Sequence, residues 1–201
     1  MTMHNTESSP ADFDFIIGSW RVKHSRLQAR LSGCSEWAAF EGTSFTRKIL
    51  GGQGNLEDNR LLLPEGAYCA VAMRSFDVDT RQWAIWWLDG RYPRQLDMPV
   101  VGSFLDGVGT FYADDTLDGR PIRVRFVWSI QSDGTPLWEQ AFSPDGGASW
   151  ESNWIMTFTR VGQHPDSRLA TDDAIVVHRQ NRADHGTSHH FTLKSAETNK
   201  S

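Results

Sequence analysis

Turn-forming residues recur roughly every ten residues from Phe13 to Arg160. Pairs such as Asp106-Gly107 supply a residue that tolerates positive φ or a side chain that bonds its own turn. Short apolar-rich segments lie between these turns, and no long helical period competes with them. The pattern is typical of an antiparallel all-β domain. We expect strands at residues 18–30, 36–49, 55–63, 67–76, 82–89, 100–105, 108–113, 121–131, 136–143 and 149–160.

Charge and hydropathy exclude several classes of partner. The chain has 20 Lys and Arg against 25 Asp and Glu, a formal net charge of −5. Nucleic-acid binding normally needs a basic surplus on one face, so we expect no nucleic-acid partner. No apolar run approaches the roughly 18 residues of a membrane helix, so we expect no membrane insertion. The first twelve residues lack the pattern of a secretory signal, so we place the protein in the cytoplasm.

The cysteines and histidines do not show the spacing of a metal-binding site. Cys34 and Cys69 have no CxxC spacing, so we expect reduced thiols that fill buried space. We expect residues 162–201 to be a polar, mobile tail whose clustered histidines are a surface feature: His178, His185, His189 and His190. We therefore expect no metal and no cofactor. Haem bound by His24, the only core histidine, is the alternative.

Several motifs resemble a known class of β-barrel. Gly18-Ser19-Trp20 resembles the Gly-x-Trp opening of lipocalin-like barrels, in which the Trp closes the barrel floor. Longer stretches are similar to an uncharacterised bacterial family of lipocalin-like (calycin-type) proteins: FDFIIGSWRVKHSRL, LGGQGN, FDVDTRQWAIWWLDGR and SPDGGASWESNWIMTFTR. The resemblance covers residues 13–161 and implies an antiparallel up-and-down barrel of about 8 to 10 strands. Residues 1–12 then form a flexible N-terminus. Because that family has no established activity, the resemblance implies a fold and not a function.

The first strand carries candidate binding residues. The period of two along a strand places Trp20, His24 and Arg26 on one face, which we predict to point inward. A buried cation needs a partner, since an unpaired charge inside a protein is costly. The partner of Arg26 is an internal carboxylate or an anionic part of a ligand, unless Arg26 reaches solvent at the barrel mouth.

The strand at residues 82–89 is apolar on both faces, with Trp87 on one face and Trp86 on the other. One face must line the interior. We expect the outer face to be covered by the tail, by residues 61–63 or by a second subunit in a homodimer. Arg91 follows directly after the strand, and it is a candidate ligand-binding group at the end of the strand.

The segment SPDGGASW at residues 143–150 matches the Asp-box pattern S-x-D-x-G-x-[ST]-W. We predict that Asp145 accepts backbone amides of the turn, that Gly147 adopts a conformation closed to other residues, and that Trp150 packs under the hairpin. Asp boxes are known from sialidase propellers, which repeat them. A single copy in a chain too short for a propeller argues against glycoside hydrolysis.

Two glutamates and an asparagine lie on the strands that flank this hairpin: Glu139, Glu151 and Asn153. If Glu139 and Glu151 lie close together, their repulsion raises one pKa and makes a general acid or base. The alternative is that one glutamate pairs with Arg123 or Arg125 in a cross-strand ladder on the outer face.

Three functions fit these features. The first is binding of a small hydrophobic or aromatic ligand in the barrel, with candidate contacts from Trp20, His24, Arg26, Trp87, Arg91 and Asn153. The second is a cofactor-independent cyclase, isomerase, lyase or hydrolase that acts on a hydrophobic metabolite, with catalytic candidates His24, Glu139 and Glu151. The third is an oligomeric interaction protein that uses its Trp-rich outer face.

Overall fold

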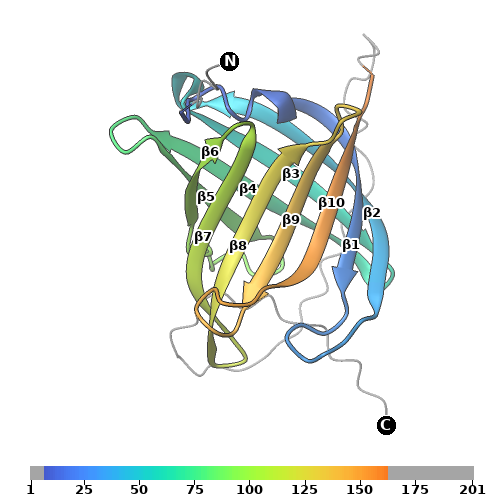
Figure 1. Ribbon diagram of the computed structural model, residues 1–201. Coiled ribbons are helices and arrows are strands. Elements are labelled where there is room, and N and C mark those ends of the chain that lie inside the picture. The colour runs from blue at the N-terminus through green and yellow to red at the C-terminus, as the bar shows by residue number, and fades with distance from the viewer. Residues whose placement is uncertain (1–6, 163–201) are drawn as a thin grey trace.

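The computed structural model describes residues 7–162, which form a closed antiparallel barrel of ten strands (Figure 1). The strands are β1 (Gly18–Leu27), β2 (Trp37–Ile49), β3 (Gly54–Leu63), β4 (Gly66–Asp77), β5 (Gln82–Asp89), β6 (Val100–Leu105), β7 (Val108–Leu117), β8 (Arg120–Ile130), β9 (Pro136–Ser143) and β10 (Glu151–Arg160). Each strand pairs with its neighbours in sequence, and β1 also pairs with β10. The predicted all-β, up-and-down barrel is confirmed. The tail predicted after Gly162 lies outside the described residues.

Two tight turns show why this sequence forms hairpins. Asp106 and Gly107, with φ of 51° and 81°, connect β6 to β7. Asp118 and Gly119, with φ of 50° and 76°, connect β7 to β8. Two-residue turns with positive φ at both positions match the right-handed twist of the flanking strands. They therefore fix the register in which β7 pairs with its two neighbours.

The segment before β1 closes one end of the barrel. The 3-10 helix η1 (Asp14–Ile16) lies at that end (Figure 1). Phe13 is buried there in edge-to-face contact with Trp83 and Phe104, at 4.9 Å between ring centroids in both cases. The indole Nε1 of Trp20 donates to the Ile16 carbonyl oxygen at 2.7 Å, and the Arg160 guanidinium lies 4.2 Å above the Trp20 ring. Trp20 therefore belongs to the packing of the closed end.

Residues 7–12 are held against the barrel by hydrogen bonds. Ser8 is buried, and its hydroxyl oxygen accepts the backbone N–H of Phe104 at 3.2 Å. The Asp12 carboxylate accepts the indole N–H of Trp83 at 3.3 Å. These contacts join the segment to β5 and β6 and complete the closed end.

The interior wall has a polar side and an aromatic side. Strands β2 to β4 contribute buried polar residues: Ser44, Thr46, Asn55, Glu57, Asn59 and Arg74. Strands β8 to β10 contribute rings and apolar chains: Phe126, Trp128, Trp138, Trp154, Met156 and Phe158. A molecule in the barrel therefore meets hydrogen-bonding groups on one side and ring faces on the other.

Trp86 marks the outer face of β5, which was predicted to be covered by another segment. Trp86 lies opposite Met73 on β4 and is half-buried. Leu61 and Leu63 point into the barrel, so these two residues do not cover Trp86.

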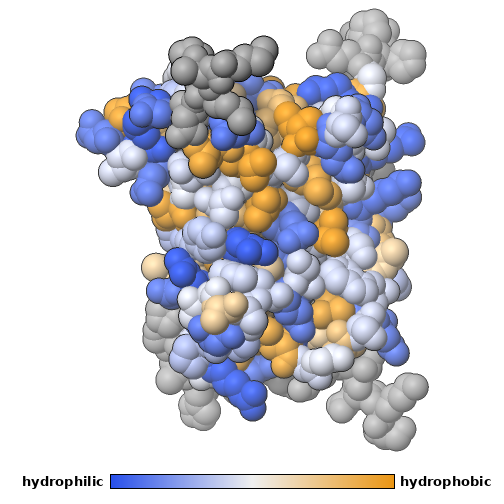
Figure 2. All heavy atoms as spheres, in the orientation of Figure 1, coloured by the Kyte–Doolittle hydropathy of each residue, from blue (hydrophilic) through white to orange (hydrophobic). Residues whose placement is uncertain are grey.

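The outer face formed by β7 to β10 carries apolar residues interspersed with polar ones, as Figure 2 shows.

The hairpin between β9 and β10 is held by its own side chains. Asp145 accepts the backbone N–H and the hydroxyl of Ser149 at 2.9 and 2.6 Å. Gly147 has a φ of 106°, and the indole N–H of Trp150 donates to the Gly147 carbonyl oxygen at 3.0 Å. Asp145 is thus fully engaged in the turn and lies outside the barrel interior.

Replacement of Phe13 by Ala tests the role of the closed end. Phe13 is 1% exposed and contacts several rings, so Phe13→Ala should lower the free energy of unfolding by about 3–5 kcal/mol. The matched control is Phe45→Ala, because Phe45 is 51% exposed and its loss should cost less than about 1 kcal/mol. Urea unfolding followed by circular dichroism measures both. Equal losses would show that the segment before β1 does not stabilise the barrel.

Candidate ligand-binding cavity

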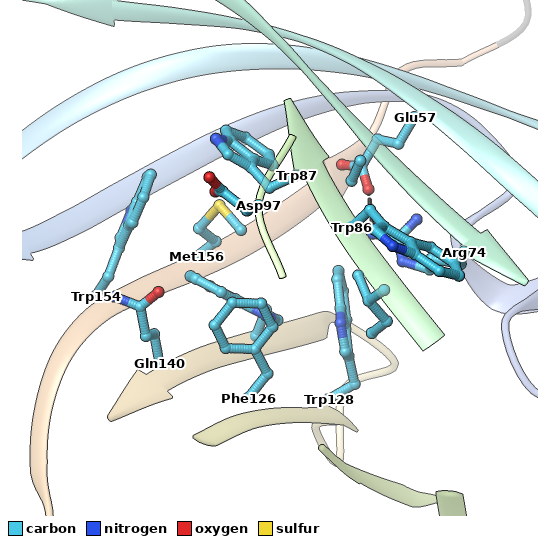
Figure 3. A pocket seen from close by; sticks show the side chains of 13 residues that line it. Glu57, Arg74, Trp86, Trp87, Asp97, Phe126, Trp128, Gln140, Trp154 and Met156 are labelled. Atoms are coloured by element: carbon cyan, nitrogen blue, oxygen red, sulfur yellow. Dashed lines mark hydrogen bonds and ion pairs between the residues drawn. The ribbon is translucent and has the colours of Figure 1, made fainter. Parts of the chain in front are cut away.

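A cavity of about 50 Å³ lies inside the barrel, bordered by β3 to β5 and by β8 to β10 (Figure 3). This space has room for roughly four water molecules. The aromatic residues that border it are Trp86, Trp87, Phe126, Trp128, Trp138 and Trp154. Its polar lining consists of Glu57, Arg74, Asp97 and Gln140.

The aromatic rings of the cavity pack edge to face. Trp138 and Trp154 have centroids 5.6 Å apart and planes at 84°, and Trp87 meets Trp154 at 6.4 Å and 79°. Phe126 meets Trp138 at 4.9 Å and 71°. Such pairs contribute about 0.5–1.5 kcal/mol each beyond the burial of their area. The rings therefore hold each other in place and form a rigid apolar wall.

A buried ion pair forms the polar floor. The Arg74 guanidinium donates to the Glu57 carboxylate and, at 2.8 Å, to Asn55 Oδ1. It lies between the rings of Phe13 and Trp128, at 5.0 and 5.2 Å from their centroids. Both charged side chains are at most 3% exposed. Since a broken buried pair leaves one charge uncompensated, these residues hold each other in place.

Three aspartates approach one another at the open end of the barrel: Asp89, Asp97 and Asp115. Asp97, in the loop between β5 and β6, lines the cavity. Burial and the nearby Asp89 raise the pKa of Asp97 to about 7. Burial, with a contribution from Asp97, also raises the pKa of Asp115 to about 7. No group of three His, Cys, Asp or Glu within residues 7–162 has the arrangement of a metal site.

His24 lies behind the aromatic wall. Its ring stacks on Phe40, with centroids 4.5 Å apart and planes at 8°. Its Nδ1 accepts the indole N–H of Trp154 at 3.3 Å, so the neutral ring carries its proton on Nε2. Burial, and then the positive charge of Arg26, lower the pKa of His24 to about 3. A Cβ at Gly42 would lie 2.8 Å from His24 Nε2, so only glycine fits beneath this ring. His24 is therefore a neutral group that orients Trp154.

Arg26 and Arg91 lie at the open end above the cavity. The Arg26 guanidinium lies 5.3 Å above the Trp154 ring and 5.4 Å above the Phe40 ring. Arg91 lies 3.8 Å above the Tyr68 ring and binds both carboxylate oxygens of Asp89. The Asp89 carboxylate also accepts the Arg91 backbone N–H at 2.9 Å, so it holds its own turn. The open end therefore carries cations next to ring faces.

Three other residues predicted from the sequence to form the site do not line the cavity. Asn153 is fully buried, and its Oδ1 accepts the side-chain N–H of Gln140 at 2.7 Å, so it contacts the cavity only through Gln140. Glu151 accepts the backbone N–H of Leu31 at 2.7 Å. Trp20 packs at the closed end and is not in the cavity lining.

Glu139 lies on the outer face of the barrel, which separates it from the cavity and from Glu151. One of its carboxylate oxygens accepts the Ser152 hydroxyl at 2.9 Å and lies 3.9 Å from Arg125 Nη2. Its strand partners Val127 and Ile155 lie on the same outer face. This geometry is that of the cross-strand Glu–Arg ladder and not of a carboxylate pair.

The polar floor and Asp97 were not identified as site residues from the sequence. Arg74 shares a strand face with Ala70 and Ala72, and a cation on such a small-residue face is a signal that could have found it. Glu57 alternates with Asn55 in the same way. Asp97 follows an irregular loop, where no periodic pattern predicts the direction of a side chain.

Comparison with known proteins adds no relative. The sequence matches no protein-family model and no curated protein. No helix within residues 7–162 is long and apolar enough to cross a membrane.

The effect of pH on stability tests the neutral state of His24. In the unfolded chain the imidazole takes up a proton near pH 6.5, whereas in the folded barrel it does so near pH 3. Its contribution is thus complete above pH 6.5 and is lost as the pH falls toward 3, at about 1.4 kcal/mol per pH unit.

The control variant is His24→Gln, which keeps an acceptor for Trp154 and does not titrate. Between pH 6 and pH 4 the wild type should therefore lose stability relative to His24→Gln, as measured by urea unfolding at each pH. A difference between the two proteins that stays constant with pH would contradict a buried neutral His24.

Proposed function

We propose that this barrel binds a small hydrophobic or aromatic molecule in its interior cavity. The observation that carries the proposal is the cavity of about 50 Å³ bordered by Trp87, Trp138 and Trp154. Ligand sites are typically concave, mostly apolar and furnished with a few polar groups. The closed ten-stranded barrel is also compatible with the lipocalin-like (calycin-type) fold implied by the Gly-x-Trp motif and by the longer similar stretches of sequence.

Two polar residues act as anchors in this proposal. Arg26, above the Trp154 ring, meets a polar end of the ligand that projects from the open end of the barrel. His24 sets the orientation of Trp154 through the hydrogen bond to its indole N–H. Trp87 supplies a second wall.

Filling the cavity tests this function. Ala72 lines the cavity and lies opposite Trp87, so Ala72→Leu places a larger side chain in the space. Toluene should raise the midpoint of thermal unfolding of the wild-type protein in a concentration-dependent way, because a ligand that binds only the folded state stabilises it. It should have no such effect on Ala72→Leu.

The control is Ala84→Leu, which makes the same change on the outer face of β5. This variant should respond to toluene as the wild type does. If Ala72→Leu and the wild type respond equally, the cavity is not the binding site.

An acid–base enzyme in the same cavity is the second candidate, and the observation that favours it is the Asp97 carboxyl. Its pKa of about 7 leaves it able to give or accept a proton at neutral pH. Incubation of a bound ligand with the protein, followed by liquid chromatography with mass spectrometry, separates the two functions, because chromatography also resolves isomers of equal mass. Recovery of unchanged ligand supports binding, whereas a product formed by the wild type and not by Asp97→Asn supports catalysis.

A further inference from the structure

Two residues of the cavity lining carry a buried hydrogen-bond donor without an acceptor within residues 7–162, Arg74 at Nε and Trp87 at Nε1. Arg74 binds Glu57 and Asn55 through its other nitrogens, whereas the indole of Trp87 has no second N–H. The indole Nε1 of Trp87 is buried and has no hydrogen-bond partner among residues 7–162. The indoles of Trp20, Trp83, Trp150 and Trp154, by contrast, all donate to protein atoms. An unsatisfied buried donor costs free energy that a ligand oxygen can recover. The position of Trp87 therefore indicates a ligand with an acceptor atom.

A second hydrogen-bonding group lies beside Trp87. The backbone N–H of Asp97 donates to the Trp87 carbonyl oxygen at 3.0 Å, which holds the two residues together. Figure 3 shows the Asp97 carboxyl and the Trp87 indole at the same side of the cavity. Within the described part of the chain, the Asp97 carboxyl makes no hydrogen bond or ion pair, and its charged neighbours Asp89 and Asp115 are themselves acidic.

We propose that the cavity selects a neutral, single-ring ligand with a carbonyl oxygen that accepts hydrogen bonds from Trp87 Nε1–H and from the Asp97 carboxylic acid. The inference rests on the proposed binding function and names the chemical class of its ligand. The ring of the ligand packs against Trp138 and Trp154, and its oxygen points to the corner formed by Trp87 and Asp97.

Charged ligands fit this corner less well. An organic cation would leave the Trp87 donor without an acceptor, and it would share the Trp154 ring with the Arg26 guanidinium, 5.3 Å away. An anion would meet three neighbouring aspartates, of which Asp89 is bound by Arg91. A neutral acceptor satisfies Trp87 and adds no charge to the buried site.

The protonation of Asp97 makes this binding depend on pH. The charged groups around Asp97 are the Asp89–Arg91 pair at the end of β5, Asp115 on β7, and the Glu57–Arg74 pair in the cavity lining. The carboxyl donates a hydrogen bond only when protonated, and its pKa is about 7. Affinity for a carbonyl ligand should therefore be constant at low pH and should fall as the pH rises through 7.

Three probes with the same carbon frame test the selectivity. Acetophenone carries the carbonyl oxygen, α-methylstyrene has a CH₂ group in its place, and 1-phenylethylamine is a cation at neutral pH. Titration calorimetry at pH 6 should show acetophenone binding about tenfold more tightly than α-methylstyrene, the ratio expected when one buried donor gains an acceptor. The amine should bind most weakly.

Two variants assign the effect to its residues. Trp87→Phe keeps a ring and removes the donor, so acetophenone should lose about tenfold in affinity while α-methylstyrene, the internal control for folding, is unaffected. Asp97→Asn should make acetophenone binding independent of pH between 6 and 8. In Asp115→Asn the pH dependence should persist, with its midpoint at a lower pH because one repelling carboxylate is gone.

The outcomes separate the two proposals. If none of the three probes nor toluene binds the wild-type protein, the binding function itself is overturned. If α-methylstyrene binds as tightly as acetophenone, the cavity binds ligands but does not select a carbonyl. If the amine binds most tightly above pH 7, the acidic corner selects cations and the inference is wrong.

Discussion

The pairing of β1 with β10 closes the sheet, and the rest of the structure depends on it. Seven residue pairs join the two strands, from Trp20 opposite Arg160 to Arg26 opposite Trp154. An open sheet would leave two edges of unpaired backbone groups and would expose its inner side chains to water. Closure instead places His24 next to Trp154 and Arg160 over Trp20, although the residues of each pair are more than a hundred positions apart in the sequence.

A closed interior makes isolated polar groups costly, and most of those in the barrel occur in linked sets. Arg74 is bonded to Glu57 and Asn55, and Gln140 is bonded to Asn153. These sets stabilise the walls and leave little capacity for a ligand. Trp87 and Asp97 differ, because they contribute a donor and a carboxyl to the cavity without a protein partner within residues 7–162. The polar groups that can bind a ligand therefore lie together, at the side of the cavity formed by Trp87 and Asp97.

Sequence periodicity predicted side-chain direction well where the chain is a regular strand. His24 was expected on an inner face and Trp87 on the face opposite to Trp86, and both His24 and Trp87 point inward because the barrel keeps the period of two. Glu139 and Glu151 could not be placed, because their faces depend on a register shift between Ser152 and Trp154. Asp97 could not be found at all, since its direction depends on how the loop after β5 folds back over the open end.

Turn spacing and alternation by themselves determine that this chain forms an antiparallel all-β domain, because both are local properties set by φ tolerance and by the period of a strand. They also determine which tryptophans share a face. Only the tertiary structure decides which inner side chains meet across the barrel. The pairing of Arg74 with Glu57, the neutral state of His24 and the place of Asp97 beside Trp87 all depend on distances between segments that the closed sheet brings together.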